Sequence, residues 1–297
     1  MEDLTKKLKT KLTGLKINEP LAQFTTFKIG GPAKFFFVGH DNNSIIKAIK
    51  YARELGLNYF ILGNGSNILI SDKGFDGLVI KMENKKTFFD EEEVKAESGL
   101  PLQKLIRETI AKKLTGLEFL IGIPGTVGGG VAGNVGTPTN WIGEKITEVE
   151  VLNAESEVNV IPKSQCDFSY RFSRFKYDDK EIILAVKFRL EKSSSNIIQK
   201  KVTDFLNNRS HQPISKPCAG SIFKNPEGKK AWQLIDEAGL RGKQIGGAKV
   251  SDEHANFIIN TGFGKAEDVV ILISYIKQQV RDQTGYQLQE EIKYVGF

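Results

Sequence analysis

Three stretches of the sequence hold residue types that could bind an anion or move a proton. Residues 62–71 read LGNGSNILIS, in which glycines alternate with short polar side chains directly after a strand-like run. Residues 116–138 contain eight glycines, one proline before its end and almost no charge. Residues 217–226 read PCAGSIFKNP and place Ser221 between a glycine and an apolar pair.

The stretch 62–71 is suited to holding a phosphate. Glycines permit positive φ and allow backbone N–H groups to converge, while Asn64, Ser66 and Asn67 add side-chain donors. It is not the dinucleotide fingerprint G-x-G-x-x-G, because no helical pattern opens after it. A plain β-turn between two strands explains the same residues equally well.

The stretch 116–138 cannot be a stable helix throughout, and its glycines would weaken a strand. Backbone without side chains allows a flat or bulky group to approach closely. The alternative is a glycine-lined packing contact inside the protein. Two such glycine-rich segments in one chain favour a nucleotide-type cofactor.

The composition limits the class of protein. Two cysteines, Cys166 and Cys218, are too few for a disulfide framework, so we expect a reducing cytoplasm. Three scattered histidines make a protein-bound metal unexpected. The net charge of +6 favours an anionic partner, but without an aromatic-and-basic RNA motif we expect small anions and no nucleic acid. No apolar run approaches the ~20 residues that span a bilayer, so we expect no membrane contact.

The elements that must position these stretches alternate between strands and helices. Residues 33–38 read as a strand, and residues 41–56 as a helix capped by Asp41 or Asn43. Three short strands follow up to residue 82, and residues 93–192 form a second α+β unit that ends in a hairpin and a strand. Residues 193–213 are expected to be a polar helical connector. Two further helices lie beyond it, the second stopped by Gly285.

Seven motifs in order resemble the family of UDP-N-acetylenolpyruvoylglucosamine reductases. They are FTTFKIGGPA (24–33), GNGSN, IGIPGTVGGGVAGN, YRFSRFK, GSIFKNP, IGGAKVSDEHANFIIN (245–260) and LQEEIKYVG (288–296). The resemblance covers nearly the whole chain. It implies an α+β fold: a two-lobed FAD-binding domain of the vanillyl-alcohol oxidase (PCMH) type and a C-terminal substrate domain. We expect lobes at 1–84 and 85–200 and the substrate domain at 201–297.

The resemblance also implies the activity. The family consists of flavoenzymes that use NADPH to make UDP-N-acetylmuramate from UDP-N-acetylglucosamine-enolpyruvate for peptidoglycan, and hence for cell shape and division. FAD is expected to be non-covalent, since neither glycine-rich segment contains His or Cys. We expect a monomer whose partners are these two substrates. The residues implied to hold FAD are Asn64, Gly65, Ser66, Asn67, Gly125, Thr126, Gly128, Gly129 and Asn134.

The family's motifs imply three catalytic residues. Ser221 matches the serine that delivers a proton to C2 of the enolpyruvyl group after hydride reaches C3. Arg171 and Glu291 match the residues that stabilise charge on the substrate carboxylate. By itself, Ser221 reads as an ordinary strand residue. Strand alternation would place Arg171 and Arg174 on opposite faces, and likewise Glu290 and Glu291, so only the motif selects one of each pair.

Substrate contacts are implied for Tyr170, Asn225 and His254, although Tyr170 could equally be a core residue and His254 a strand-end residue. Lys216 and Lys224 are candidates for the UDP phosphates on charge alone. The sequence departs from the family at 137–143, TPTNWIG, and it lacks room for the tyrosine-bearing loop of one branch. It therefore resembles the compact branch.

Two alternatives stay open at this point. A flavin oxidase or dehydrogenase of the same fold would act on another alcohol or sugar. A nucleotide- or sugar-binding protein could have kept the scaffold without catalysis.

Overall fold

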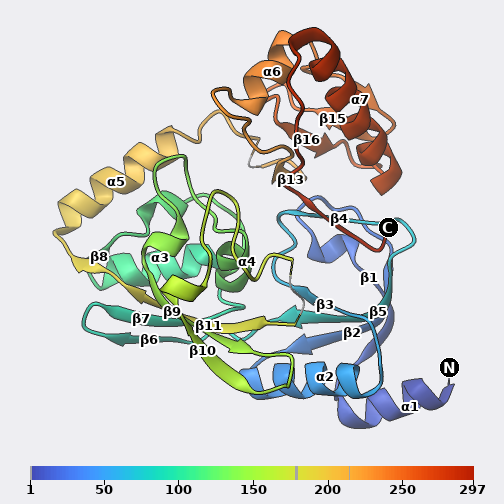
Figure 1. Ribbon diagram of the computed structural model, residues 1–297, viewed down its shortest axis with the longest axis vertical. Helices are drawn as coiled ribbons and strands as arrows, with labels where there is room; N and C mark the ends of the chain where they lie inside the picture. The colour runs from blue at the N-terminus through green and yellow to red at the C-terminus, as the bar shows by residue number, and fades with distance from the viewer. Residues whose placement is uncertain (1, 178–179, 214) are drawn as a thin grey trace. The chain divides into compact units, whose positions relative to one another are not determined.

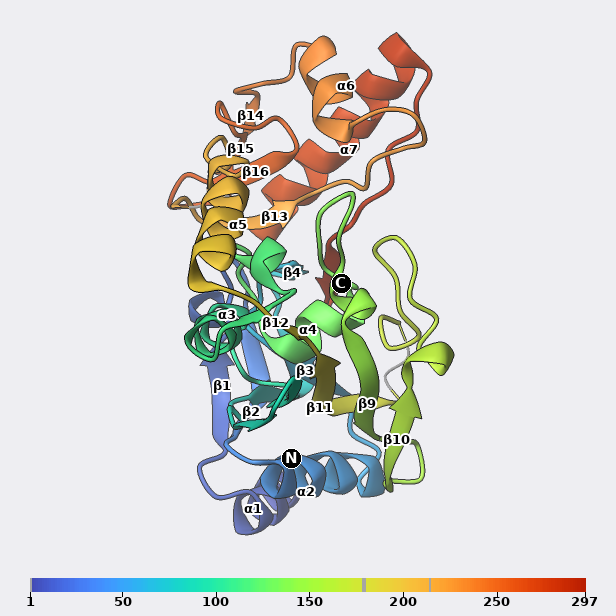
Figure 2. The same ribbon diagram turned by 90° about the vertical axis from the view of Figure 1, so that its left-hand side faces the viewer.

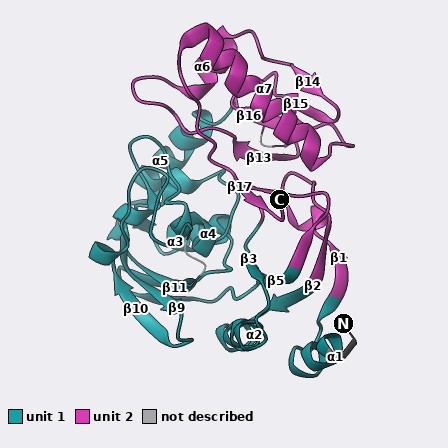
Figure 3. Ribbon diagram, turned by 45° about the vertical axis from the view of Figure 1, so that its right-hand side comes forward, with its two compact units in different colours: residues 1–16, 36–64, 77–210 teal, residues 17–35, 65–76, 211–297 magenta. Residues whose placement is uncertain are grey.

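The computed structural model describes residues 2–177, 180–213 and 215–297 of the chain. The chain forms two compact units, each assembled from separate pieces of the sequence (Figure 3). Unit 1 comprises Met1–Lys16, Phe36–Asn64 and Gly77–Ser210, and unit 2 comprises Ile17–Phe35, Gly65–Asp76 and His211–Phe297. The three consecutive domains expected from the sequence stay a prediction, because these units follow contacts and not order along the chain.

The N-terminal half begins with helix α1 (Glu2–Lys11) and the short η1 (Ala22–Phe24). Its four-stranded sheet has the order β1 (Lys16–Pro20), β2 (Pro32–Gly39), β5 (Phe75–Met82) and β3 (Tyr59–Leu62). Strands β3 and β5 are parallel, with Tyr59 opposite Leu78. The strand predicted at 33–38 is thereby confirmed, and β3 and β5 confirm two of the three short strands expected up to residue 82.

Helix α2 (Asn42–Glu54) starts as its sequence predicts. The Asp41 carboxylate accepts the Ser44 N–H at 2.7 Å, and the Ser44 hydroxyl accepts the Asp41 N–H at 3.3 Å. This reciprocal pair is a capping box, which satisfies N–H groups that the first helical turn cannot. Asp41, and not Asn43, is therefore the cap.

Unit 1 is centred on an antiparallel five-stranded sheet. Its order is β10 (Val158–Pro162), β9 (Ile146–Leu152), β11 (Ile182–Arg189), β7 (Glu93–Glu97) and β6 (Thr87–Asp90). The predicted hairpin is confirmed, with Val158 opposite Leu152. Helices α3 (Leu102–Ala111) and α4 (Val127–Ala132) lie over one face of this sheet (Figure 1). Their buried residues, such as Leu105 and Val131, join Val149 and Phe188 of the sheet in one core.

Short elements complete unit 1. They are β8 (Leu114–Thr115) paired with β12 (Glu191–Lys192), the single turns η2 (Glu118–Leu120), η3 (Ile142–Glu144) and η4 (Lys163–Gln165), and helix α5 (Ser195–Asn207). Helix α5 confirms the predicted connector. The Ser194 side chain caps it by accepting the N–H of Ile197.

Unit 2 has a four-stranded antiparallel sheet in the order β13 (Cys218–Ser221), β16 (Phe257–Asn260), β15 (Ala248–Val250) and β14 (Gln244–Ile245). Helices α6 (Ala231–Glu237) and α7 (Ala266–Thr284) cover one face of it (Figure 2). Leu234, Ile273 and Ile258 lie in the core between helices and sheet. Helix α7 ends at Gly285, whose φ of +75° confirms the predicted cap.

A second pairing inside unit 2 joins distant parts of the chain. Strand β4 (Ile68–Ile70) lies parallel to β17 (Lys293–Val295), with Lys293 opposite Ile68. Strand β4 directly follows the glycine-rich loop, and β17 follows the LQEE segment. The pairing therefore brings the glycine-rich loop 63–67 and the motif LQEEIKYVG (288–296) together.

Each unit holds one buried, unbridged cysteine: Cys166 in unit 1 and Cys218 in unit 2. Burial raises the pKa of Cys166 to about 11 and also raises the pKa of Cys218. Among the described helices, none is long and apolar enough to cross a bilayer.

Candidate functional site

The first glycine-rich loop, residues 63–67, offers backbone donors. Gly65 has φ +60°, and a Cβ there would lie 2.5 Å from the Phe24 carbonyl oxygen, so only glycine fits. In the part of the chain that the structure describes, the backbone N–H groups of Gly63, Asn64, Gly65 and Asn67 make none of the backbone-to-backbone bonds found in the turns and loops. Converging N–H groups of this kind suit an anion such as a pyrophosphate.

The same loop contacts the second glycine-rich segment within unit 1. The Asn64 amide donates to the Gly125 carbonyl at 3.3 Å. A Cβ on Gly63 would lie 2.7 Å from the Thr126 hydroxyl oxygen. Three of the residues expected to hold FAD, Asn64, Gly125 and Thr126, are therefore neighbours, although about sixty positions separate them in the sequence.

The second segment forms helix α4 in spite of its glycines. Thr126 caps the helix, with its hydroxyl accepting the Gly129 N–H at 3.3 Å. Gly128 donates to the Ser98 carbonyl at 2.8 Å, and a Cβ on Gly128 would lie 2.8 Å from the Ser98 Cβ. Gly129 differs, since a Cβ there would meet only the Thr126 hydroxyl, at 3.4 Å. Gly128 thus allows close packing, whereas Gly129 leaves space that a cofactor can use.

Asn134 organises the loops that follow α4. Its φ is +43° and it is almost fully buried. Its side-chain amide donates to the Ser169 carbonyl at 2.8 Å, and its side-chain oxygen accepts the Gly143 N–H at 3.0 Å. The departure from the family at 137–143 has a defined conformation here: Thr137 and Asn140 close a tight turn through a 2.7 Å backbone bond.

The prediction that Arg171 and Arg174 lie on opposite faces of a strand is wrong, because residues 169–176 form turns and not a strand. Arg171 has φ +56° and donates to the Gly136 carbonyl at 3.1 Å. Its guanidinium lies 5.5 Å from the centre of the Tyr170 ring, and Tyr170 is about half exposed. Arg174 instead forms a two-point ion pair with Glu181, at 2.8 Å for each bond. The structure thus distinguishes the two arginines by partner, where spacing could not.

Arg209 is a candidate that sequence reasoning missed. Its guanidinium donates to the Phe119 carbonyl at 2.9 Å, and its side chain would contact a Cβ built on Gly122 at 3.2 Å. Burial, and secondarily the positive charge of Arg171, lower its pKa. Two cations near the glycine-rich segment create a positive potential in unit 1. An arginine in the polar stretch RSHQP gave no local signal for this role.

Ser221 lies in unit 2 at an irregularity in its sheet. Strand β13 has one more residue than β16 between the pairs Cys218–Ile259 and Ser221–Phe257. Gly220 has φ +73°, which permits this bulge, and a Cβ on it would lie 3.8 Å from the Ser66 carbonyl oxygen. The strand thus brings Ser221 beside the loop that contains Ser66.

The backbone of Glu291 bonds to the residue after Ser221 and to the glycine-rich loop that contains Ser66. Its N–H donates to the Ile222 carbonyl at 2.8 Å, and its own carbonyl accepts from the Asn67 amide at 3.3 Å. Glu290 points away, with its carboxylate 2.7 Å from the Lys277 ammonium. Leu288 and Ile292, which share the face of Glu290, are buried. Leu288 and Ile292 are buried as the expected alternation requires, and the choice of Glu291 over Glu290 stays a prediction.

The residues expected to contact substrate have defined neighbours. The Asn225 side-chain oxygen accepts the Ala231 N–H at 3.0 Å, at the start of α6. The His254 ring lies between Trp232 and Phe257, with ring centres 6.0 and 4.9 Å away. Burial, followed by the charge of Arg241, lowers the pKa of His254.

Lys216, one of the two candidates for the UDP phosphates, pairs with Glu253 at 2.5 Å. Lys224, the other, donates its backbone N–H to the Gln289 carbonyl at 2.8 Å. These contacts place both lysines near the residues of unit 2 described above without assigning them a ligand.

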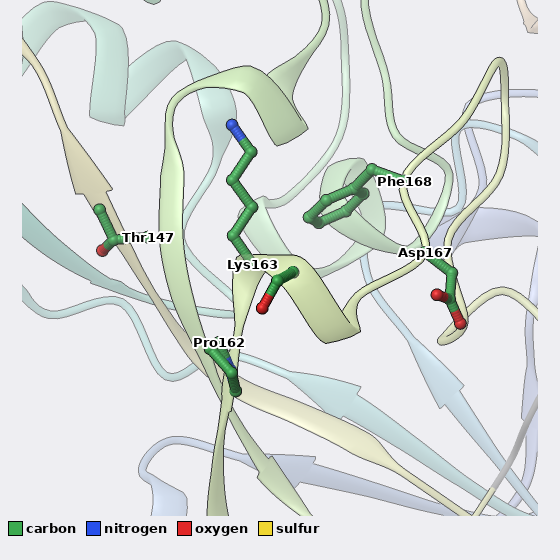
Figure 4. A pocket seen from close by; sticks show the side chains of 6 residues that line it. Thr147, Pro162, Lys163, Asp167 and Phe168 are labelled. Atoms are coloured by element: carbon green, nitrogen blue, oxygen red, sulfur yellow. The ribbon is translucent and has the colours of Figure 1, made fainter.

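A separate open hollow in unit 1 lies over the β9–β10 hairpin (Figure 4). Its lining residues are Thr147, Pro162, Lys163, Ser164, Asp167 and Phe168. The Lys163 ammonium donates to the Glu144 carbonyl at 2.8 Å. No residue predicted for FAD, substrate or catalysis lines this hollow, so it is not part of the candidate site. Among the described residues, no cluster of His, Cys, Asp or Glu could hold a metal ion.

Comparison with known proteins gives the family. The profile of the UDP-N-acetylenolpyruvoylglucosamine reductase C-terminal domain matches residues 212–295, and that of an FAD binding domain matches residues 33–161. The UDP-N-acetylenolpyruvoylglucosamine reductase of Carboxydothermus hydrogenoformans is 41% identical over 99% of this chain and 97% of its own length. The chain belongs to this reductase family. The enzyme of that name from Caldanaerobacter subterraneus is 40% identical over 95% of this chain and 94% of its own.

A solved structure supports the family at the level of the fold. The UDP-N-acetylenolpyruvylglucosamine reductase of Thermus caldophilus superposes with a TM-score of 0.81 at 31% identity, covering 95% of this chain and 98% of that one. The α+β fold, with a PCMH-type FAD-binding domain and the reductase C-terminal domain, is thus confirmed. The protein is an FAD-binding oxidoreductase of peptidoglycan precursor synthesis.

The residues present fit an FAD. Loop 63–67 supplies backbone N–H donors, and the open side of Gly129 leaves room beside α4. Neither segment contains a histidine or cysteine that could attach the flavin covalently.

Proposed function

We propose that the protein uses NADPH to reduce the enolpyruvyl ether of UDP-N-acetylglucosamine-enolpyruvate to UDP-N-acetylmuramate, with non-covalent FAD. One observation supports this most strongly. Within unit 2 the Asn67 amide bonds to the Glu291 carbonyl, and Gly220 lies against Ser66, so a proposed FAD loop meets both Ser221 and Glu291. A scaffold that only bound nucleotides would not require its FAD loop to contact the segments that carry Ser221 and Glu291.

FAD, when bound, would take hydride from NADPH and pass it to C3 of the enolpyruvyl group. Loop residues Asn64, Gly65, Ser66 and Asn67 would hold the pyrophosphate through N–H groups. The second segment would line the rest of the cofactor with the residues Gly125, Thr126, Gly128, Gly129 and Asn134. Of these, Gly128 and Asn134 would act mainly by shaping the backbone, since their contacts are internal.

Ser221 would donate a proton to C2 of the substrate. A serine hydroxyl is a poor acid in water, because its pKa is very high. It can act here since addition of hydride at C3 leaves a carbanion at C2 that is conjugated with the carboxylate and is strongly basic. The bulge at Gly220, directly before Ser221, supports this role, because it would set the direction in which the Ser221 side chain leaves the strand.

Arg171 and Glu291 would stabilise the charge that builds up on the substrate carboxylate. A planar guanidinium matches a carboxylate in two-point geometry. The left-handed backbone at Arg171 and its bond to Gly136 fix the direction in which the side chain leaves the loop. Arg209 would add to the positive potential around it.

Tyr170, Asn225 and His254 would contact the substrate or the nicotinamide. We further propose that the protein acts in the cytoplasm as a monomer. Its short connection from Arg171 to β11 supports the compact branch of the family, without the tyrosine-bearing loop.

The decisive experiment separates the two halves of the reaction in Ser221→Ala. Flavin reduction by NADPH needs no proton at C2, so it should keep close to its normal rate. Flavin reoxidation by the enolpyruvyl substrate should slow by about 10²- to 10⁴-fold, the range for losing a positioned general acid. Stopped-flow absorbance of the flavin measures both rates.

Ser274→Ala is the matched control, because Ser274 is exposed on α7 and its hydroxyl donates to the Val270 carbonyl one turn earlier in the same helix. Both half-reactions should be normal in this variant. Equal slowing of both halves in Ser221→Ala would show that Ser221 is structural. Failure of NADPH to bleach the wild-type flavin would contradict the reductase assignment itself.

A further inference from the structure

Asn256 is a buried residue whose side-chain amide bonds to both backbone polar groups of one residue, Phe223. It is 4% exposed, in the DEHANF segment just before β16. Its side-chain oxygen accepts the Phe223 N–H at 2.9 Å, and its side-chain nitrogen donates to the Phe223 carbonyl at 2.8 Å. Its backbone carbonyl also accepts the Ile222 N–H at 2.9 Å. One residue thus satisfies three polar groups of residues 222 and 223.

These bonds extend the sheet past the point where its strands stop pairing. Strand β13 ends with Ser221 opposite Phe257, directly after the Gly220 bulge. The chain before Asn256 then turns at His254, whose carbonyl accepts the Phe257 N–H at 3.0 Å. On this edge, the pairing of β13 with β16 ends at Ser221 and does not extend to Phe223. The Asn256 amide takes that place, because it carries the same donor and acceptor as a peptide.

On their opposite edge, residues 222–224 pair with residues 289–291. The Glu291 N–H donates to the Ile222 carbonyl, and the Lys224 N–H donates to the Gln289 carbonyl, each at 2.8 Å. Phe223 and Glu290 form an antiparallel bridge. Residues 222–224 therefore lie between Asn256 and residues 289–291. Ser221 immediately precedes this segment, and Glu291 is bonded to it.

We propose that Asn256 is a positioning residue that fixes Ser221 relative to Glu291 for protonation of the substrate at C2. The proposal rests on the proposed function, in which these two residues act on the same substrate. Asn256 is buried and both ends of its amide bond to the backbone of Phe223, so we infer that it acts through residues 222 and 223 and not by contact with the substrate. Misplacement of a reacting group by about 1 Å can cost ~10²-fold in rate.

The test compares Asn256→Ala with Asn260→Ala in the full-length holoenzyme. Asn260 is a matched control in the same unit, at the far end of β16. It is also buried and also bonds to backbone, accepting the Gly262 and Gly264 N–H groups at 2.9 Å each. In Asn256→Ala, flavin reduction by NADPH should stay near normal, while reoxidation by the enolpyruvyl substrate should fall about 10- to 100-fold with little change in KM. In Asn260→Ala the ratio of the two rates should equal the wild-type ratio.

A double variant shows whether Asn256 acts through Ser221. If it does, Ser221→Ala combined with Asn256→Ala should reoxidise no more slowly than Ser221→Ala alone. Multiplied losses would overturn the proposal. Amide hydrogen exchange without substrate gives a readout independent of activity. Exchange should speed up at residues 222–224 and 291 in Asn256→Ala but not in Asn260→Ala.

If Asn256→Ala does not fold, Asn256→Asp provides the same test, since a carboxylate can accept the Phe223 N–H but cannot donate to the Phe223 carbonyl. Equal slowing of both half-reactions in the Asn256 variants would overturn the proposal and show a general structural role. A normal reoxidation rate in Ser221→Ala would instead overturn the proposed function, so the two failures can be told apart.

Discussion

The two units hold their candidate residues by different means. In unit 1, Asn134 and Arg171 have left-handed backbones, at φ +43° and +56°, and side chains bond to loop carbonyls such as that of Ser169. In unit 2, Ser221 and Glu291 lie on extended segments joined by backbone bonds. Unit 1 therefore depends on individual side chains and special conformations, whereas unit 2 depends on register. A single substitution should act locally in unit 1, and an error in register should move several groups in unit 2.

The largest expected effect is a loss of activity that tests the register of residues 290 and 291 in unit 2. Glu291→Gln should lower kcat by about 10²- to 10³-fold, the range for losing one charge-stabilising group. Glu290→Gln should leave kcat nearly unchanged, because the Glu290 carboxylate points at Lys277. Losing that partly exposed ion pair should cost only about 0.2–1 kcal/mol of unfolding free energy. Steady-state kinetics and thermal unfolding of both variants provide the measurement.

A weaker enzyme from Glu290→Gln than from Glu291→Gln would contradict the register assigned here. The alternation along 288–293 would then not decide which carboxylate reaches the substrate.

The next effect tests the second glycine-rich segment of unit 1, where the open space beside Gly129 is proposed to accommodate FAD. Gly129→Val should give folded protein with FAD affinity weakened by roughly 10- to 100-fold, because the branched side chain fills the open side of α4. Gly133→Ala is the control, since a Cβ there would meet only the Gly129 carbonyl oxygen, at 3.6 Å.

Asn67→Leu should also lose flavin, because it changes the first glycine-rich loop, residues 63–67. Flavin absorbance per mole of purified protein measures all three, and full FAD content in both Gly129→Val and Asn67→Leu would rule out the proposed loops.

The smallest effect concerns the stability of unit 2 toward acid. Because burial lowers the pKa of His254 below its unfolded value of about 6.5, the unfolded chain binds the proton more readily. The neutral form therefore stabilises the fold above about pH 6.5, and this contribution is lost as pH falls toward the folded pKa. Arg241 disfavours the protonated ring, while Asp236 partly favours it.

His254→Gln should remove this dependence. Between pH 7.5 and 5.5, values chosen to bracket the reference pKa, wild type should lose about 0.5 kcal/mol more unfolding free energy than the variant, a figure reduced for the partly exposed ring. Urea unfolding at both pH values measures it. An equal loss in both proteins would show that other groups determine the response.

The sequence predicts what local pattern determines. Asp41 and Gly285 end their helices as expected, because capping depends on residues within a few positions. Leu288 and Ile292 are buried, as the two-residue period along 288–293 predicts. Arg171 was assigned to a strand incorrectly: its loop is held by Asn134, whose bond to Ser169 spans 35 positions. No window of sequence around Arg171 contains that constraint.

Asn256 was missed for the same reason. Its partner Phe223 is 33 residues away, and nothing in DEHANF distinguishes it from an ordinary turn asparagine. The discontinuous units are likewise set by pairings such as β4 with β17, which join residues more than 200 positions apart. Such pairings are invisible to periodicity and to boundary signals along the chain.

Because each unit contains one buried cysteine, chemical labelling of the two thiols can report local opening of each unit. A thiolate reacts with a maleimide or disulfide reagent far faster than a thiol, and burial keeps both Cys166 and Cys218 protonated and covered. Labelling in native conditions should therefore occur only when the surrounding unit opens. Mass spectrometry of the two cysteine peptides would give an opening rate for each unit separately, and adding FAD or substrate would show which unit each ligand closes.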